Sequence, residues 1–194
     1  MEQKLKLEIL QLYNQFKEED GKKVDRIEKW RNLEPESAEF ISILIRTQQS
    51  KNVLELGTSN GFSTLWFSDA LKRTNGKLVT IEIEAKRTEL ARKYLTSFKL
   101  IENVELITTD VKDFLIEADP VFEIIFLDAE RKYYIEYWIN LKKLLDKKGS
   151  LLIVDNVLSH KDDVSEFISL IENDENFIIS TVNIGAGLLL VTKQ

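Results

Sequence analysis

The sequence has 194 residues, of which 43% are hydrophobic and 31% are charged, and its formal net charge is −6. This length and composition are typical of a single globular domain, which we expect to span residues 1–194. Because the chain contains no cysteine, disulfides, thiolate metal ligands and cysteine nucleophiles are excluded. The negative charge disfavours a broad surface for nucleic acid.

No apolar run approaches the roughly 20 residues that a membrane helix requires. The first residues, MEQKLKLEILQLYNQ, are charged throughout and do not resemble a secretory signal. We therefore expect a cytoplasmic protein without a membrane partner.

Residues 1–48 are predicted to form helices ahead of the core. A first helix should end near Asp20 and Gly21, and a second should begin at Pro35, a favourable first helical residue. The apolar face of the first helix indicates packing against the core, a cover over a site, or a dimer seam. Its residues are Leu5, Ile9, Leu12, Tyr13 and Phe16.

Residues 49–194 alternate between short apolar runs and longer amphipathic stretches. The runs VLEL, LVTI, IIFL and LLIV are apolar on both faces, as buried parallel strands are. This alternation predicts an α/β core, an open sheet with helices on both faces. The last two runs are joined through NIGAG without a helix, which predicts a terminal antiparallel hairpin. The expected strands are residues 52–56, 77–83, 104–109, 122–127, 150–154, 177–182 and 188–191.

Polar residues follow the first five predicted strands. In open α/β sheets, ligands bind at the carboxyl ends of the strands. A single acid there is explained as a turn or cap residue, but a whole set at one edge indicates a binding site. After the first strand comes GTSNGFS, and after the next four come Glu82 and Glu84, Asp110, Asp128, and Asp155 with Asn156.

The glycine-rich stretch contains a literal G-x-S-x-G at residues 57–61. A serine hydrolase requires such a turn followed by an acid and a histidine, and Ser59, Asp128 or Asp155, and His160 satisfy this order. The motif follows the first strand, however, and a hydrolase leaves the other strand-end acids unexplained. The hydrolase therefore stays an alternative.

The second interpretation is a nucleotide-like cofactor. A glycine turn lets the backbone approach a ligand closely, and Glu82, at the end of the second strand, can bind both ribose hydroxyls. The turn reads ELGTSNG and lacks the G-x-G-x-x-G that binds a pyrophosphate. S-adenosylmethionine has no phosphate, and Glu55 suits its positive charges. Asp110 is expected near the adenine ring.

Four longer stretches carry a more specific signal. VLELGTSNGFSTLWFSDAL, LVTIEIEAKRTELAR, EIIFLDAERKYYIEYW and GSLLIVDNVLSH resemble the metal-dependent O-methyltransferase family that includes catechol and caffeoyl-CoA O-methyltransferases. The resemblance begins near Leu33 and extends to the closing NIGAGLLLVTK. It implies a Rossmann-like class I methyltransferase fold, a seven-stranded, mostly parallel sheet whose last strand is antiparallel. It also implies S-adenosyl-L-methionine as methyl donor and a homodimer.

The resemblance further implies a divalent cation bound by Asp128, Asp155 and Asn156. Three oxygen ligands without His or Cys suit Mg²⁺ better than Mn²⁺ or Ca²⁺. Open coordination positions could hold adjacent hydroxyls of a small aromatic acceptor, and the cation would lower the pKa of a ligated hydroxyl. Methyl transfer to a catechol-like hydroxyl is the implied reaction.

The remaining cofactor contacts are carried over residue by residue. Ser63, at the start of the helix after the turn, would hold the methionine carboxylate together with backbone N–H groups. Gly57, Ser59 and Gly61 would shape the turn. The complete set of expected cofactor residues is Glu55, Gly57, Ser59, Gly61, Ser63, Glu82, Asp110 and Asp128.

One position departs from the family pattern. The family usually carries a lysine three residues after the first metal-binding Asp, whereas this chain has Arg131 there, followed by Lys132. Because arginine stays protonated, it cannot act as that base. Either Lys132 takes over, or ionisation by the metal suffices with Arg131 as electrostatic support, or the activity has diverged.

Two further alternatives stay open, one for the acceptor and one for the activity. A hydroxylated RNA base is one, although the net charge disfavours it. A protein that binds S-adenosylmethionine without catalysis is another. Trp30 is a candidate for the acceptor wall, whereas Tyr134, Tyr137 and Trp138, at helical spacing, are expected in the core.

Overall fold

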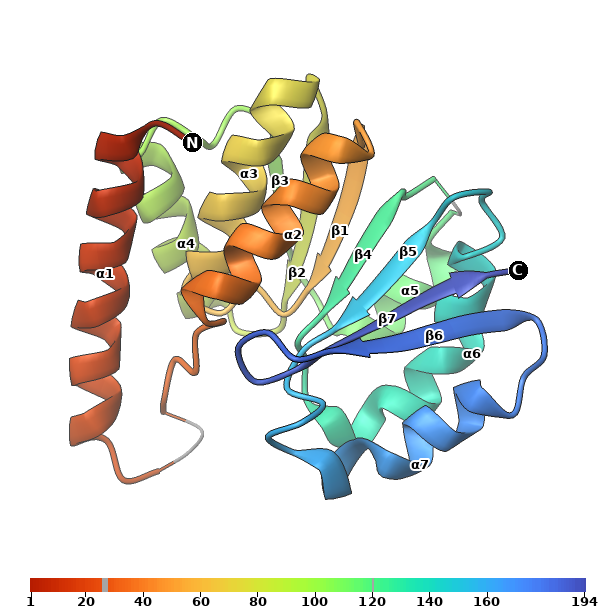
Figure 1. The fold of residues 1–194 in the computed structure, drawn as a ribbon. Helices are drawn as coiled ribbons and strands as arrows, with labels where there is room; N and C mark the ends of the chain where they lie inside the picture. The colour runs from red at the N-terminus through yellow and green to blue at the C-terminus, as the bar shows by residue number, and fades with distance from the viewer. Residues whose placement is uncertain (26–27, 120) are drawn as a thin grey trace.

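The computed structural model describes residues 1–25, 28–119 and 121–194. Strands and helices alternate from β1 to β6, and β7 follows β6 directly, as the apolar runs predict (Figure 1). The elements are α1 (Gln3–Lys22), α2 (Pro35–Thr47), β1 (Asn52–Leu56), α3 (Phe62–Thr74), β2 (Lys77–Glu82), α4 (Ala85–Ser97), β3 (Val104–Thr108), α5 (Val111–Glu117), β4 (Ile124–Leu127), the 3₁₀ helix η1 (Arg131–Tyr133), α6 (Tyr134–Leu144), β5 (Leu151–Val154), α7 (Lys161–Glu172), β6 (Phe177–Val182) and β7 (Leu188–Lys193).

The seven strands form one sheet in the order β3-β2-β1-β4-β5-β7-β6. The five strands from β3 to β5 pair in parallel, and β7 lies antiparallel between β5 and β6. The predicted sheet with an antiparallel last strand is therefore confirmed. The order reverses beside β1, so the ends of β1 and β4 flank the switch point at which such sheets bind ligands.

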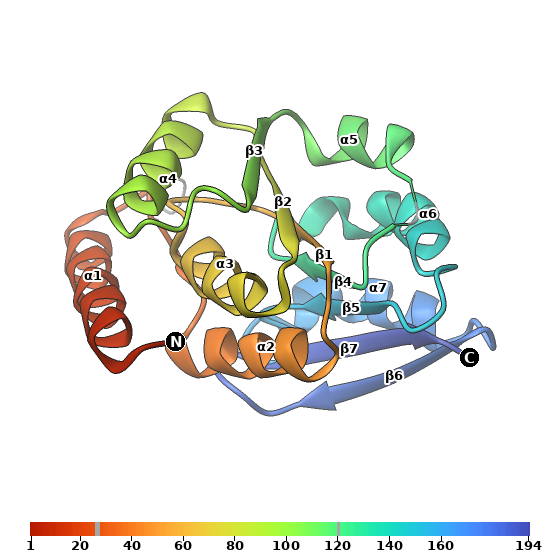
Figure 2. The same cartoon turned by 90° about the horizontal axis from the view of Figure 1, so that it is seen from above.

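Helices cover both faces of the sheet (Figure 2). Helices α1 to α4 lie on one face, and α5, α6 and α7 lie on the other. Successive side chains of a strand point to opposite faces, so Val53 joins the α1–α4 cluster and Leu54 joins the α5–α7 cluster. This explains why the strand sequences are apolar at consecutive positions.

Helix α1 packs against the core rather than standing apart from it. Ile9, Leu12 and Phe16 are buried, and the Phe16 ring meets the ring of Tyr94 on α4 edge-on, 5.4 Å away. Helix α2 begins at Pro35 as predicted. Within the described ranges, no helix is long and apolar enough to cross a membrane.

Candidate active site

A cavity of about 340 Å³ opens at the carboxyl ends of the central strands. This volume is at the lower end of the range for small-molecule pockets. Four segments supply most of its lining residues. They are residues 30–34 before α2, the turn after β1, residues 81–84 at the end of β2, and residues 128–131 after β4. The predicted strand-end residues Glu82, Glu84, Asp110, Asp128 and Asn156 all line it.

The glycine turn requires backbone conformations that most residues avoid. Gly57, Ser59 and Gly61 all have positive φ, at 110°, 49° and 86°. A Cβ atom on Gly57 would lie 2.3 Å from the carbonyl oxygen of Asp128, and one on Gly61 would lie 2.8 Å from Cβ of Ala91. The two glycines therefore allow β1 to approach β4 and α3 to approach α4.

Glu82 lies beside this turn with its carboxylate held by main-chain donors. The N–H of Ser59 donates to it at 2.8 Å and the N–H of Glu84 at 3.0 Å. Burial raises the pKa of Glu82, and these two hydrogen bonds oppose the rise. Asp110 caps α5 by accepting from the N–H of Lys112 at 2.7 Å.

Glu55 and Ser63 lie beneath the turn and are not among the described residues that line the cavity. Glu55 is completely buried and accepts hydrogen bonds from the hydroxyls of Ser63, Thr64 and Thr80. Burial raises the pKa of Glu55 to about 7 despite these bonds. Its carboxylate bonds two hydroxyls at the start of α3, and its expected place near the positive charges of the cofactor stays a prediction.

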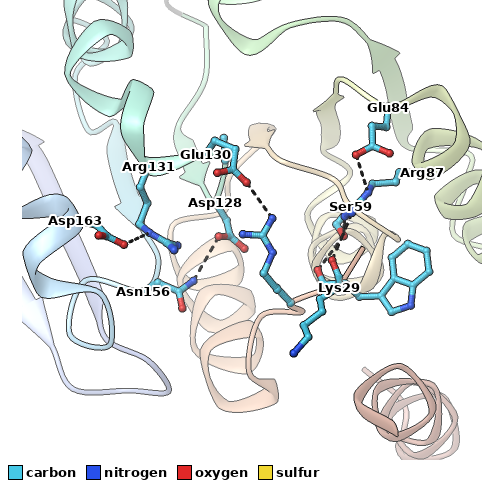
Figure 3. Close-up of polar contacts among 12 residues, drawn as sticks. Lys29, Ser59, Glu84, Arg87, Asp128, Glu130, Arg131, Asn156 and Asp163 are labelled. Carbon is cyan, nitrogen blue, oxygen red and sulfur yellow. Dashed lines mark hydrogen bonds and ion pairs between the residues drawn. The ribbon is translucent and has the colours of Figure 1, made fainter. Parts of the chain in front are cut away.

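The three expected metal ligands lie together at the ends of β4 and β5. The Asn156 amide donates to Asp155 at 2.6 Å and to Asp128 at 3.4 Å, the second contact being drawn in Figure 3. Asn156 has a φ of 65°, a left-handed conformation that asparagine tolerates better than most residues. The turn after β5 thus directs this amide toward both carboxylates.

The electrostatics of this group favour a cation. Burial raises the pKa of Asp128, and the charge of Asp155 raises it further. Burial also raises the pKa of Asp155, with Glu34 adding to the rise. Oδ1 of Asp155 is buried and has no hydrogen-bond partner in the described part of the chain. A divalent cation fits such an oxygen beside a second carboxylate and an amide.

Binding of a cation by these residues depends on Asn156. Among residues 1–25, 28–119 and 121–194, no group of three or more His, Cys, Asp or Glu side chains is arranged to hold a metal ion. Asn156 would therefore have to supply its oxygen as the third ligand, which requires the opposite orientation of its amide. The orientation of an amide follows its surrounding hydrogen bonds. A bound cation would favour the orientation in which the oxygen of Asn156 faces it.

Arg131 and Lys132 take different places. Arg131 is 9% exposed, lines the cavity and pairs with Asp163 at 3.3 Å. Its charge opposes the rise in the pKa of Asp128. Lys132 is exposed, and its Nζ lies 4.7 Å from the centre of the Tyr133 ring. It is not among the described residues that line the cavity. Of the two, Arg131 is therefore the cation beside the proposed metal ligands.

Residues 29–34, which we call the strap, cross the cavity before α2. Asp20 accepts hydrogen bonds from the N–H groups of Trp30 and Arg31, at 2.7 and 2.9 Å. The Ser59 hydroxyl donates to the Trp30 carbonyl at 3.1 Å, and Arg87 donates to the Lys29 carbonyl at 3.4 Å. The strap could not be predicted from the sequence, because these contacts join segments far apart in the chain.

Trp30 is part of the strap, and its indole ring has three charged neighbours. Its indole N–H donates to Glu19 at 2.7 Å, and Lys23 and Arg87 lie 4.1 and 5.4 Å from its ring centre. Trp30 lines the cavity at the end that carries Glu82 and Arg87. Tyr134, Tyr137 and Trp138 are buried in the core, as expected, although Tyr137 also borders the cavity.

The contacts of Ser59 and His160 do not favour a hydrolase. The Ser59 hydroxyl is bonded to the strap and also accepts from Arg87 at 3.0 Å. Nδ1 of His160 lies 3.0 Å from the hydroxyl of Ser159. A hydrolase would require His160 to activate the hydroxyl of Ser59. That hydroxyl is instead hydrogen-bonded to the Trp30 carbonyl and to Arg87.

Comparison with known proteins agrees with the fold. The O-methyltransferase family model matches residues 10–194. A catechol O-methyltransferase of Niastella koreensis is 36% identical over 132 residues, which cover 66% of this chain and 58% of that protein. A catechol O-methyltransferase of Mycobacterium tuberculosis is 32% identical over 124 residues, covering 63% and 56%. The matches thus span less than two thirds of either relative.

Two solved structures share the complete fold. The O-methyltransferase from Bacillus cereus, in complex with SAH, has a TM-score of 0.77 at 22% identity, covering 100% of this chain and 92% of that chain. TomG from Streptomyces achromogenes, in complex with SAM, has a TM-score of 0.78 at 22% identity, covering 100% and 91%.

Proposed function

Because the chain belongs to the O-methyltransferase family, we propose that it transfers a methyl group from S-adenosylmethionine to a hydroxyl of a small aromatic acceptor, with the help of a divalent cation. The observation that carries this proposal is that Asp128 and Asn156 line the same cavity as the glycine turn and Glu82. A methyl donor and an ionised acceptor can therefore be held side by side, which supplies much of the acceleration in such reactions.

The cofactor end is built by the turn, Glu82 and Asp110. Each carboxylate oxygen can accept two hydrogen bonds and those of Glu82 each have one main-chain donor, so Glu82 can also accept from ribose hydroxyls. Gly57 leaves space for close approach of a ligand to the backbone. When bound, S-adenosylmethionine supplies a methyl group already activated by the adjacent sulfonium.

The acceptor end is built by Asp128, Asp155 and Asn156, which would hold Mg²⁺ or another divalent cation. Such a cation lowers the pKa of a ligated hydroxyl. Arg131 adds a fixed positive charge and cannot accept the proton. We assign it electrostatic support, and we keep Lys132 as the alternative base because it follows in the same 3₁₀ turn.

The other expectations stay proposals. A catechol-like acceptor and a homodimer rest on the resemblance, and a cytoplasmic location rests on the composition. Methylation of a hydroxylated RNA base and cofactor binding without catalysis are the competing functions.

The test is transfer of labelled methyl from S-adenosylmethionine to 3,4-dihydroxybenzoate and caffeate, with MgCl₂ or with EDTA. We expect transfer with Mg²⁺ and none with EDTA. Transfer that persists in EDTA would refute the role of the metal. Absence of transfer, in protein shown to bind S-adenosylhomocysteine, would favour the RNA or binding-only alternatives.

A further inference from the structure

Arg31 reaches from the strap into the same cavity as Asp128. Its Nη2 lies 3.0 Å from Oε1 of Glu130, two residues after Asp128 (Figure 3 shows Asp128, Glu130 and Asn156). We propose that Arg31 binds a carboxylate of the acceptor, so that the preferred acceptors are hydroxylated aromatic acids. This inference rests on the proposed function and names the substrate class of that site.

The position of Arg31 is built into the backbone. Its φ is 51°, a left-handed conformation that residues other than glycine rarely adopt. Asp20 fixes this conformation by accepting from the N–H groups of both Trp30 and Arg31. Backbone strain that the surroundings enforce is concentrated at functional sites. Here its effect is to place a guanidinium at the cavity.

The guanidinium can exchange its present partner at low cost. The side chains of Arg31 and Glu130 are 38% and 53% exposed, and ion pairs this exposed to water contribute little to stability. An acceptor carboxylate enclosed in the cavity offers two oxygens in the plane that the guanidinium fork matches. It would therefore bind more strongly than the exposed Glu130 does.

The other two arginines that line the cavity already bond to groups of the protein that surround them. Arg131 is almost completely buried and pairs with Asp163. Arg87 bonds Ser59, Glu84 and the strap. Of these three arginines, Arg31 is the one whose side chain is held by a single exposed ion pair, with Glu130. It is thus the arginine best placed to take an acceptor group.

The surrounding charges orient such an acceptor. Arg31, Arg131 and Asp128 line the same cavity, and the partner of Arg31 follows Asp128 by two residues. Glu34, another carboxylate, also lines this cavity. A carboxylate on the ring is therefore expected at Arg31, away from Glu34, with the hydroxyls toward Asp128. A neutral apolar ring would remove water from these charges without compensation.

The test measures binding to the full chain saturated with S-adenosylhomocysteine and Mg²⁺. Isothermal titration gives the Kd of 3,4-dihydroxybenzoate and of 4-methylcatechol, which differ in the carboxylate. We expect wild type to bind the acid at least about tenfold more tightly. Arg31→Met should weaken binding of the acid by about 10- to 100-fold, the loss of a charged hydrogen bond, and change binding of the neutral catechol by less than about threefold.

Arg92→Met is the matched control, because Arg92 pairs with Glu89 on the exposed surface of α4. It should leave both Kd values unchanged. If circular dichroism shows that Arg31→Met does not fold, Arg31→Gln removes the charge while keeping a polar side chain. Equal binding of the two ligands by wild type, no binding of the acid, or an unchanged preference in the Arg31 variant would each overturn the inference.

Labelled methyl transfer, read on the same proteins, separates the two proposals. Transfer to both catechols without preference for the acid would refute the role of Arg31 and leave the proposed function standing. Selective binding of the acid without any transfer would refute the proposed function and leave the carboxylate site standing.

Discussion

A Cβ atom on Gly57 would lie 2.3 Å from the main-chain carbonyl oxygen of Asp128. The two residues follow β1 and β4, which pair in parallel, and the N–H of Asp128 continues that ladder by donating to Leu56 at 3.0 Å. Gly57 therefore sets how closely the glycine turn approaches the proposed metal ligands.

Gly57→Ala should damage both stability and activity. The new methyl group would meet backbone, which cannot rotate away as a side chain can, and the φ of 110° is unfavourable for alanine. We expect the free energy of unfolding to fall by about 2–4 kcal/mol. Urea unfolding measures this loss, and methyl transfer by the folded fraction should fall at least about tenfold.

Gly149→Ala is the control for the backbone contribution alone. Gly149 also has a positive φ, of 84°, but an added Cβ would meet no heavy atom within 4 Å. Its cost should be about 1–2 kcal/mol, without an effect on methyl transfer. Equal losses in the two variants would show that the close approach of Gly57 to Asp128 is unimportant.

Asp155→Asn should separate stability from metal binding. Asp155 and Asp128 repel one another in a buried place, so removing one charge should raise the free energy of unfolding in EDTA at about pH 8, by about 1–2 kcal/mol. In wild type, MgCl₂ should raise Tm because a ligand of the folded state stabilises it. The variant should lose that increase.

Differential scanning fluorimetry with MgCl₂ and with EDTA measures both effects. Asp162→Asn, an exposed carboxylate in the first turn of α7, is the control and should keep the increase in Tm. An increase of equal size in Asp155→Asn would place the cation elsewhere.

Hydrophobic periodicity predicted the elements well because it reports burial. The same property explains the errors at strand ends. The run at residues 122–127 was expected as a strand, but β4 begins at Ile124. Phe122 is buried without joining the strand, and its carbonyl accepts a hydrogen bond from the hydroxyl of Ser150 at 2.8 Å. Ile83, expected in the second strand, is 63% exposed and follows it.

The strand-end acids were predictable because parallel strands end at one edge of a sheet. The strap was not, since it depends on Asp20 and on an arginine in a conformation that sequence preferences disfavour. The surroundings of Glu55 were equally inaccessible, because they depend on the direction in which the hydroxyls of Ser63 and Thr64 point.

Ser59→Ala distinguishes a methyltransferase from a hydrolase. The hydroxyl holds the strap through Trp30 and Arg87, so its loss should raise KM for S-adenosylmethionine by about three- to tenfold, corresponding to one or two hydrogen bonds. The kcat should change little, and hydrolysis of p-nitrophenyl acetate should be absent in wild type and variant alike. Ester hydrolysis that Ser59→Ala abolishes would refute this interpretation.

Ser59→Gly separates the hydroxyl from the backbone. Ser59 has a φ of 49°, which glycine adopts without strain and alanine does not. The two variants share the loss of the hydroxyl. If the strap depends on the hydroxyl, as we expect, both should raise KM equally. A normal KM in Ser59→Gly would assign the effect to backbone strain.

Glu55 should make the stability of the protein depend on pH. Burial raises its pKa in the folded state to about 7, from an ordinary value of 4.5. Between these values the folded state keeps a proton that the unfolded state releases, so stability falls as the pH rises through this window and levels off above it. The fall amounts to about 3 kcal/mol at 1.36 kcal/mol for each pH unit.

Glu55→Gln should remove this contribution while leaving groups that can bond the three hydroxyls. Urea unfolding from about pH 4.5 to 8 should show wild type losing stability relative to the variant as the pH rises. Glu89→Gln changes an exposed carboxylate on α4, 72% exposed, and should follow wild type throughout. A constant difference between wild type and Glu55→Gln would mean that the hydroxyls of Ser63, Thr64 and Thr80 keep Glu55 ionised, despite its burial.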